Sequence, residues 1–150
     1  MNILILGSGG REHSLAWAVK QNPKCDRLIV APGNAGIAQI ADCAKIVPEN
    51  AAEVISFAAD NAIDFVIIGP EAPLAAGVSD ALQDAGFLVF GPSQAAAQLE
   101  ASKSFTKEIC DAAQAPTAGY AHFKDKDAAL AYVRNQGAPI VFKADGLAAG

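Results

Sequence analysis

The first thirteen residues constrain the fold of this chain more than any other stretch. Met1–Leu6 reads MNILIL, an apolar run with β-branched isoleucines, and it stops at Gly7-Ser8-Gly9-Gly10. A helical pattern opens directly afterwards, at Arg11-Glu12-His13. A strand, a glycine turn and a helix N-terminus in this order direct backbone N–H groups at one point, where the helix dipole favours an anion. The pattern predicts a phosphate cradle, in which glycine lets the backbone approach the ligand.

The dinucleotide-binding fingerprint G-x-G-x-x-G fits this turn only in part. Gly7-Ser8-Gly9 matches its first two glycines, but Glu12 stands in the third position. The fingerprint also needs an acidic residue about 20 residues further on, and the second predicted strand ends at Val30-Ala31-Pro32-Gly33 without one. NAD is therefore disfavoured, while Arg11 and His13 favour a phosphorylated ligand because both can donate to phosphate oxygens. A tight strand-to-helix turn without a ligand stays open as the alternative.

Composition narrows the class of protein. The 150 residues carry a net charge of −5 and no basic run, whereas binding to a nucleic-acid backbone needs clustered Lys and Arg. The three cysteines are widely spaced and form no C-x-x-C pair, which argues against a disulfide framework and for a reducing cytoplasm. The N-terminal apolar run is too short for a signal peptide or a membrane span. We expect a cytoplasmic protein whose partners include neither nucleic acid nor membrane.

Strand and helix patterns alternate over the first hundred residues. Strands are predicted over Met1–Leu6, Asp26–Ala31, Ala44–Val47, Asp64–Ile68 and Phe87–Phe90, and helices over Glu12–Gln21, from Asn50 to about Asn61, and over about Ala76–Ala85. This order predicts an α/β fold, an open and mostly parallel sheet with helices on both faces, of the Rossmann-like kind. Ligands of such sheets bind outside the carboxyl ends of the strands. Loops 7–10, 32–36, 69–74 and 91–93 are therefore expected to share one edge.

A second informative stretch follows the strand Asp64–Ile68. It reads Gly69-Pro70-Glu71-Ala72-Pro73-Leu74. Two prolines around a single carboxylate predict a stiff loop that fixes where Glu71 points.

The rhythm of elements changes after residue 101. Ser102 is predicted to cap a helix, and the elements expected from there on are a helix over Lys103–Ala113, a strand over Gly119–Phe123, a helix from Asp125 to about Gln136, a strand over Pro139–Lys143 and a small-residue loop over Asp145–Gly150. These elements are too few for a core of their own. They either pack on the first domain or begin a second one, and the glycine-rich loop over Asp145–Gly150 favours the second. We therefore expect the 150 residues to be part of a longer protein.

Four stretches together carry a family resemblance. They are Gly7-Ser8-Gly9-Gly10-Arg11-Glu12-His13-Ser14, Gly69-Pro70-Glu71-Ala72-Pro73-Leu74, Ser102-Lys103-Ser104-Phe105-Thr106-Lys107 and Pro139–Gly150. In order and spacing they resemble the phosphoribosylamine–glycine ligase (glycinamide ribonucleotide synthetase) family of the ATP-grasp superfamily, over the whole chain. The resemblance implies two domains, an N-terminal substrate-binding domain over residues 1–101 and, over residues 102–150, the start of an ATP-grasp domain. It also implies ligation of glycine to 5-phosphoribosylamine with ATP and Mg²⁺ or Mn²⁺, through glycyl phosphate, in purine synthesis.

The resemblance also implies site residues. Those expected to bind substrate are Gly9, Gly10, Arg11, Glu12, Glu71, Pro73 and Leu74, and those expected to bind ATP are Lys103, Lys143, Asp145, Gly146 and Gly150. The side-chain chemistry agrees, because glycine amides and an arginine can hold a phosphate, a fixed carboxylate can accept from ribose hydroxyls, and a lysine at a strand end can supply charge to ATP phosphates. Metal ligands are expected beyond residue 150, so the 150 residues alone are expected to be inactive.

Two other functions stay open. One is another ATP-grasp carboxylate–amine ligase or carboxylase with the same N-terminal domain. The other is a non-catalytic Rossmann nucleotide-binding module, which predicts measurable NAD binding. The expected partners are the small-molecule substrates, and a monomer is expected because nothing in the sequence demands an oligomer.

Overall fold

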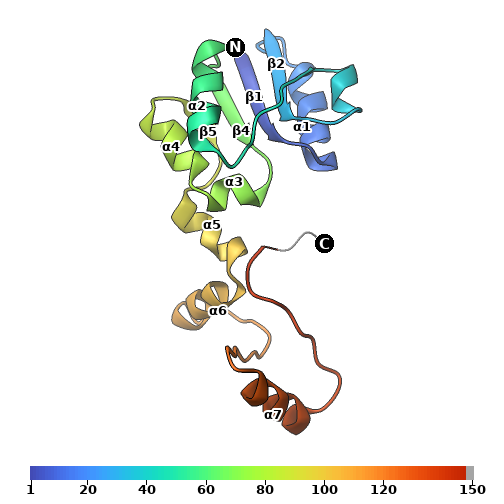
Figure 1. Cartoon of the computed structure of the whole chain (residues 1–150), viewed down its shortest axis with the longest axis vertical. Coiled ribbons are helices and arrows are strands. Elements are labelled where there is room, and N and C mark those ends of the chain that lie inside the picture. Colours follow the sequence, from blue (N-terminus) through green and yellow to red (C-terminus); the bar gives the residue numbers. More distant parts are fainter. Residues whose placement is uncertain (148–150) are drawn as a thin grey trace. The chain divides into compact units, whose positions relative to one another are not determined.

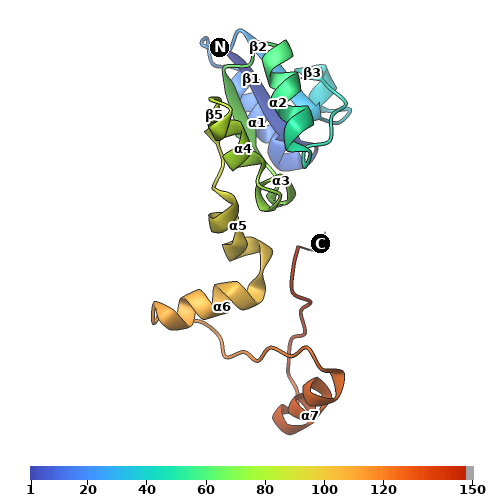
Figure 2. The ribbon, with the colours of Figure 1, turned by 60° about the vertical axis from the view of Figure 1, so that its left-hand side comes forward.

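The chain folds into two units, Met1–Ala97 and Gln98–Gly150, in a computed structural model that describes residues 1–147. Figure 1 shows the elements along the chain, and Figure 2 shows the same ribbon turned by 60°. The strands are β1 (Asn2–Gly7), β2 (Arg27–Pro32), β3 (Asp42–Cys43), β4 (Phe65–Ile68) and β5 (Leu88–Phe90). The helices are α1 (Gly10–Lys20), η1 (Ile37–Gln39, a 3₁₀ helix), α2 (Ala51–Asp60), α3 (Glu71–Ala75), α4 (Val78–Asp84), α5 (Gln94–Ala101), α6 (Lys103–Ala112) and α7 (Lys126–Gln136).

A parallel five-stranded sheet organises the first unit, in the order β3-β2-β1-β4-β5. β1 lies at its centre because its residues are apolar on both faces, and Leu4, Ile5 and Leu6 are fully buried. The chain first adds β2 and β3 on one side of β1 and then crosses to β4 and β5 on the other. The direction of strand addition therefore reverses between β1 and β4, which is the point where open parallel sheets form a ligand crevice.

Helices cover both faces of the sheet (Figures 1 and 2). On one face, α2, α3 and α4 pack on β1 residues such as Leu4, with Leu82 of α4 fully buried. On the opposite face, Ala16 of α1 packs with Ile5, the next residue along β1. Successive side chains of a strand point to opposite faces, so one apolar strand serves both layers. The predicted open parallel sheet with helices on both faces is confirmed.

The loops at the carboxyl ends of the strands meet at one edge, as predicted. The N–H of Gly33 donates to the carbonyl of Gly7 at 3.1 Å, and the N–H of Gly69 donates to the carbonyl of Leu6 at 3.1 Å. The turn after β1 is thus flanked by the loops after β2 and β4. We call this edge of the sheet, formed by the loops at residues 7–10, 32–36 and 69–74, the crevice.

The prediction of a strand over Ala44–Val47 is wrong, because β3 consists of Asp42 and Cys43. The strand pairs with β2 through Val30, whose carbonyl accepts from the N–H of Ala44 at 3.1 Å. The next residue of β2 that faces β3 is Pro32, which has no N–H to continue the ladder. The pairing therefore stops before the residues that the apolar pattern favoured.

The prediction of one helix over Ala76–Ala85 is also wrong. Two helices, α3 and α4, meet at Gly77, whose φ of +84° breaks the helical path. The stretch predicted as a stiff loop opens α3 at Glu71, and Pro73 lies in the first turn of that helix. Proline fits there because first-turn N–H groups have no partner within the helix.

In the second unit both predicted helices form, whereas the two predicted strands do not. Helices α6 and α7 begin as predicted, with the side chains of Ser102 and Asp125 accepting from backbone N–H groups at their N-termini. The strands predicted over Gly119–Phe123 and Pro139–Lys143 are absent, and that prediction is wrong. Their residues favour extended backbone, but a strand needs a neighbour to pair with, and residues 98–147 supply none. No element was predicted over α5, Gln94–Ala101.

No helix among the described residues has both the length and the apolar character that crossing a bilayer requires.

The assignment of the core predicts the cost of two matched truncations. Leu82 of α4 is fully buried, whereas Leu88 of β5 is 64% exposed. Leu82→Ala is expected to lower the free energy of unfolding by about 2–5 kcal/mol, because it removes buried apolar atoms and leaves a cavity. Leu88→Ala removes the same atoms from the surface and is expected to change it by about 0.5 kcal/mol. Urea unfolding measures both, and equal losses would contradict this core.

Candidate functional site

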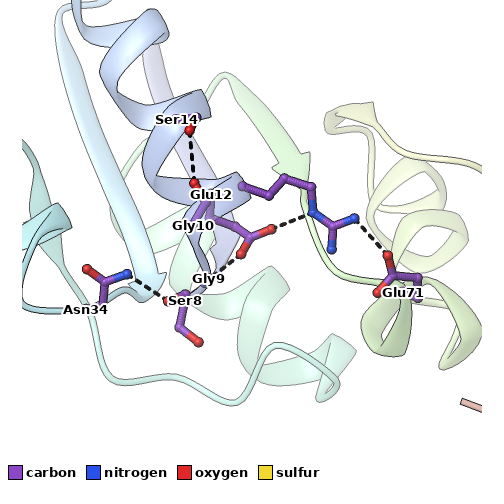
Figure 3. Close-up of polar contacts among 8 residues, drawn as sticks. Ser8, Gly9, Gly10, Glu12, Ser14, Asn34 and Glu71 are labelled. Carbon is purple, nitrogen blue, oxygen red and sulfur yellow. Dashed lines mark hydrogen bonds and ion pairs between the residues drawn. The ribbon is translucent and has the colours of Figure 1, made fainter. Parts of the chain in front are cut away.

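The turn between β1 and α1 is held by side chains from other loops. Asn34, in the loop after β2, donates its Nδ2 to the carbonyl of Ser8 at 2.7 Å (Figure 3). Its Oδ1 accepts from the N–H groups of Gly36 and Ile37, both at 2.9 Å. One amide side chain therefore ties the second loop of the crevice to the first. Sequence reasoning missed Asn34, although an Asn within a glycine- and proline-rich turn is a signal for such a bridge.

Arg11 forms the main electrostatic link across the crevice. Its Nη1 donates to Oε1 of Glu71 at 2.7 Å, and its Nε donates to Oε1 of Glu12 at 3.0 Å (Figure 3). Glu71 is the first residue of α3, sixty residues away in sequence. The cluster carries one positive and two negative charges. The structure thus brings together three of the residues predicted to bind substrate.

These contacts shift the pKa values of Arg11 and Glu71. The hydrogen bond from Arg11 lowers the pKa of the Glu71 carboxyl, and the hydrogen bond from the backbone N–H of Glu71 itself acts in the same direction. The hydrogen bonds to Glu71 and Glu12 raise the pKa of Arg11 above its ordinary value. Glu71 and Arg11 are therefore both charged across the physiological range of pH.

Glu12 lies beneath the turn, with 3% of its surface exposed. Its Oε2 accepts from the N–H of Gly9 at 2.7 Å. A Cβ atom added at Gly9 would lie 2.8 Å from that oxygen, and Cβ atoms added at Gly7 or Gly69 would overlap the Glu12 side chain. The glycines of this turn therefore make room for a buried carboxylate.

The two glycines predicted to bind phosphate differ in what surrounds them. The N–H of Gly9 is already bonded to Glu12. Gly10 begins α1, is exposed, and has open space where a Cβ would lie. The open part of the cradle is consequently the first turn of α1, together with the half-exposed side chain of Arg11.

Other predicted residues near the crevice are less accessible. Pro73 and Leu74 are buried, and Leu74 belongs to the core beneath α3. Neither side chain is open to a ligand. The His13 ring packs against Gly36, since a Cβ there would lie 2.8 Å from its Cε1.

The second unit brings together three of the residues predicted to bind ATP. The carboxylate of Asp145 accepts from the N–H of Lys103 at 2.6 Å and from the hydroxyls of Ser102 and Ser104. The Nζ of Lys103 donates to the carbonyl of Gly146 at 2.8 Å. The loop after residue 143 is thus clipped to the N-terminus of α6.

Asp145 is held in its charged form by this clip. The hydrogen bond from the Ser104 hydroxyl, with those from the backbone N–H groups of Lys103 and Gly146, lowers the pKa of the Asp145 carboxyl. Sequence reasoning missed Ser104. Lys143 is exposed, and Gly150 lies outside the described residues.

Metal-ligating side chains do not converge in the part of the chain that the structure describes. Within residues 1–147, no three His, Cys, Asp or Glu side chains lie close enough to hold an ion together.

Two family models match the chain end to end. The first, described as Phosphoribosylglycinamide synthetase, N domain, matches residues 1–100. The second, Phosphoribosylglycinamide synthetase, ATP-grasp (A) domain, matches residues 101–150. Together they leave no residue of the chain unmatched.

Individual relatives agree with these matches. The chain is 58% identical over 150 residues to the phosphoribosylamine–glycine ligase of Agrobacterium fabrum, which covers 100% of this chain and 36% of the relative. The crystal structure of phosphoribosylamine–glycine ligase from Thermotoga maritima aligns with a TM-score of 0.73 and 27% identity, over 98% of this chain and 34% of that one. The chain therefore spans about a third of the length of these relatives.

A further structural likeness concerns the fold alone. The biotin carboxylase domain of the Hydrogenobacter thermophilus 2-oxoglutarate carboxylase, solved with MgADP, ADP and bicarbonate, aligns with a TM-score of 0.68 over 92% of this chain and 33% of that one. The sequence identity is 16%.

The Arg11–Glu71 pair predicts a specific titration. Because the folded-state pKa of Glu71 is lowered, the pair stabilises the fold above the ordinary carboxyl pKa of about 4.3 and is lost only as pH falls through the lower value. A ¹³C NMR titration is expected to show Glu71 ionising below about 4.3, and ionising at higher pH in Arg11→Met. Arg27→Met, which removes an arginine paired with Asp42 instead, is expected to leave Glu71 unchanged. An unshifted Glu71 in the unsubstituted chain would refute the pair.

Proposed function

The chain belongs to the phosphoribosylglycinamide synthetase family, and from that premise we propose that it is part of an ATP-dependent ligase that joins glycine to 5-phosphoribosylamine. The observation that carries the proposal is the unbroken match to relatives named for this reaction. The crevice adds support, since an arginine and a carboxylate face each other beside a glycine turn. We assign residues 1–101 to substrate binding and 102–150 to the start of the ATP-grasp domain.

The first unit supplies groups that suit a ribose phosphate. We assign the phosphate to the first turn of α1, at Gly10 and Arg11, where the helix dipole and a guanidinium both favour an anion. Glu71, held ionised by Arg11, is assigned to the ribose hydroxyls, for which it is an acceptor. Two carboxylates and one guanidinium leave the cluster with a net negative charge, which also suits the amine end of the substrate.

The second unit supplies groups that suit ATP. Lys143, an exposed cation just before the Asp145-Gly146 loop, is assigned to the ATP phosphates. Lys103 and Asp145 hold that loop to α6, so we assign them the role of shaping the nucleotide site. Mg²⁺ or Mn²⁺ would neutralise phosphate charge when bound, and we assign none of its ligands to residues 1–147.

The proposed reaction needs positioning more than covalent help from the protein. ATP transfers its γ-phosphoryl group to the glycine carboxylate and leaves as ADP, and the product is glycyl phosphate. The amine of phosphoribosylamine attacks the acyl carbon, loses a proton and displaces inorganic phosphate. The residues assigned above hold the reacting groups and their charges in place, which is the main source of rate in such transfers.

The cysteines bear on the location of the protein. Cys25, Cys43 and Cys110 are all free thiols, as is usual in a reducing compartment. We propose a cytoplasmic enzyme that acts as a monomer on small molecules.

The structure of the turn disfavours the NAD-binding alternative. The third glycine of the dinucleotide fingerprint permits close packing of helix on strand. Here Glu12 takes that position, and its side chain fills the space below the turn. The residues that end β2 are apolar, with no acid for a ribose hydroxyl.

Activity and binding measurements test the proposal. The full-length protein that carries this chain is expected to release ADP from ATP over many turnovers only when glycine and phosphoribosylamine are both present, and not when bicarbonate replaces glycine. Arg11→Met is expected to raise the KM for phosphoribosylamine about tenfold or more, because a charge-assisted hydrogen bond to phosphate is lost. The KM for ATP serves as the internal control and should stay the same. Bicarbonate-dependent turnover, or NAD binding by calorimetry, would overturn the assignment.

A further inference from the structure

Glu12 is the one ionisable residue that is buried within residues 1–147. It is 3% exposed, and the other buried polar residue of these 147 is Ser79. Taking a carboxylate out of water is costly unless hydrogen bonds and a counter-charge compensate for the lost hydration. A buried carboxylate within a ligand crevice therefore needs an explanation from its contacts.

Glu12 contacts the glycine turn, the Arg11 side chain and the loop after β4. One oxygen accepts from the N–H of Gly9, which fixes the backbone of the turn, and the other accepts from the Nε of Arg11. Gly7, Gly9 and Gly69 lack the side chains that would collide with it. Gly69 follows β4, so the carboxylate fits only where the first and fourth strands lie side by side.

The orientation of Arg11 follows from two carboxylates that hold it on different nitrogens. Glu12 takes Nε and Glu71 takes Nη1 (Figure 3). No described residue accepts from Nη2, which is left to bind a ligand. Because Arg11 is half exposed, its long side chain would otherwise sample several rotamers, and fixing them in advance lowers the entropy lost on binding.

We propose that Glu12 is a positioning residue, which touches no ligand itself and holds the glycine turn and the Arg11 guanidinium in the geometry that receives a sugar phosphate. The inference rests on the proposed function, because that function assigns the phosphate to Arg11. It departs from the expectation that Glu12 contacts the substrate. A carboxylate with both oxygens in use and 3% exposure has no free face to offer.

Ribose 5-phosphate binding to the full-length protein that carries this chain, followed by NMR titration, tests the proposal. Glu12→Gln keeps the size of the side chain but puts an amide donor against the donors of Gly9 or Arg11, so it is expected to weaken binding about tenfold. Arg11→Met is expected to weaken it at least as much. The loss in the double variant is expected to be smaller than the two single losses combined, because part of the Glu12 effect acts through Arg11. Additive losses would overturn the proposal.

Glu53→Gln is the matched control. Glu53 is the third residue of α2, as Glu12 is the third residue of α1. The Glu53→Gln substitution is expected to leave binding unchanged. Thermal unfolding of every variant separates the role in stability from the role in positioning. A folded Glu12→Gln chain that binds like the unsubstituted chain would show that Glu12 only stabilises the turn.

A measurement on the unsubstituted chain covers the case in which Glu12→Gln does not fold. The Nε–H of Arg11 is expected to exchange with water at least about tenfold more slowly than that of the exposed Arg134, because Glu12 accepts its hydrogen bond. Equal exchange rates would overturn the proposal. Slow exchange without any binding of ribose 5-phosphate would instead refute the phosphate assignment and leave the Glu12–Arg11 contact standing.

Discussion

The crevice of this protein depends on one buried carboxylate. Glu12 lies under the turn that joins β1 to α1, in a space that three glycines leave open. The same carboxylate takes the N–H of Gly9 and one nitrogen of Arg11. A charge buried this deeply fixes its surroundings, because each of its hydrogen bonds is costly to lose. The shape of the turn and the direction of the guanidinium therefore have a common cause.

The sheet topology gives that carboxylate its second wall. β4 enters next to β1 after the chain has built β2 and β3 on the other side. This step brings Gly69 over the Glu12 side chain and Glu71 to the guanidinium of Arg11. A glycine turn that resembles a dinucleotide-binding motif thus becomes a site with an arginine between two carboxylates. The fold is shared with biotin carboxylase domains, and the side chains at this edge give it its own chemistry.

In the second unit, too, one carboxylate joins residues that are far apart in the sequence. Asp145 caps α6 from more than forty residues away and draws the Asp-Gly loop to Lys103. The segments of this unit that were predicted as strands stay unpaired, because residues 98–147 contain no strand with which they could pair. Local helix signals were enough to form α6 and α7, because a helix satisfies its backbone within itself. Strands depend on partners, so the same sequence rules failed for Pro139–Lys143.

Much of the local structure follows from residues that lie close together in the sequence. Apolar runs predict the central strands, and the glycine turn predicts the junction of β1 and α1. Asn50 and Ser102 start helices, because each side chain accepts a hydrogen bond from the backbone N–H three residues further on. Packing of the elements against one another, by contrast, buries Glu12, brings Arg11 to Glu71 and places Pro32 where the pairing of β2 with β3 ends. Such contacts join residues far apart in sequence, and the order of strands in the sheet decides which of them meet.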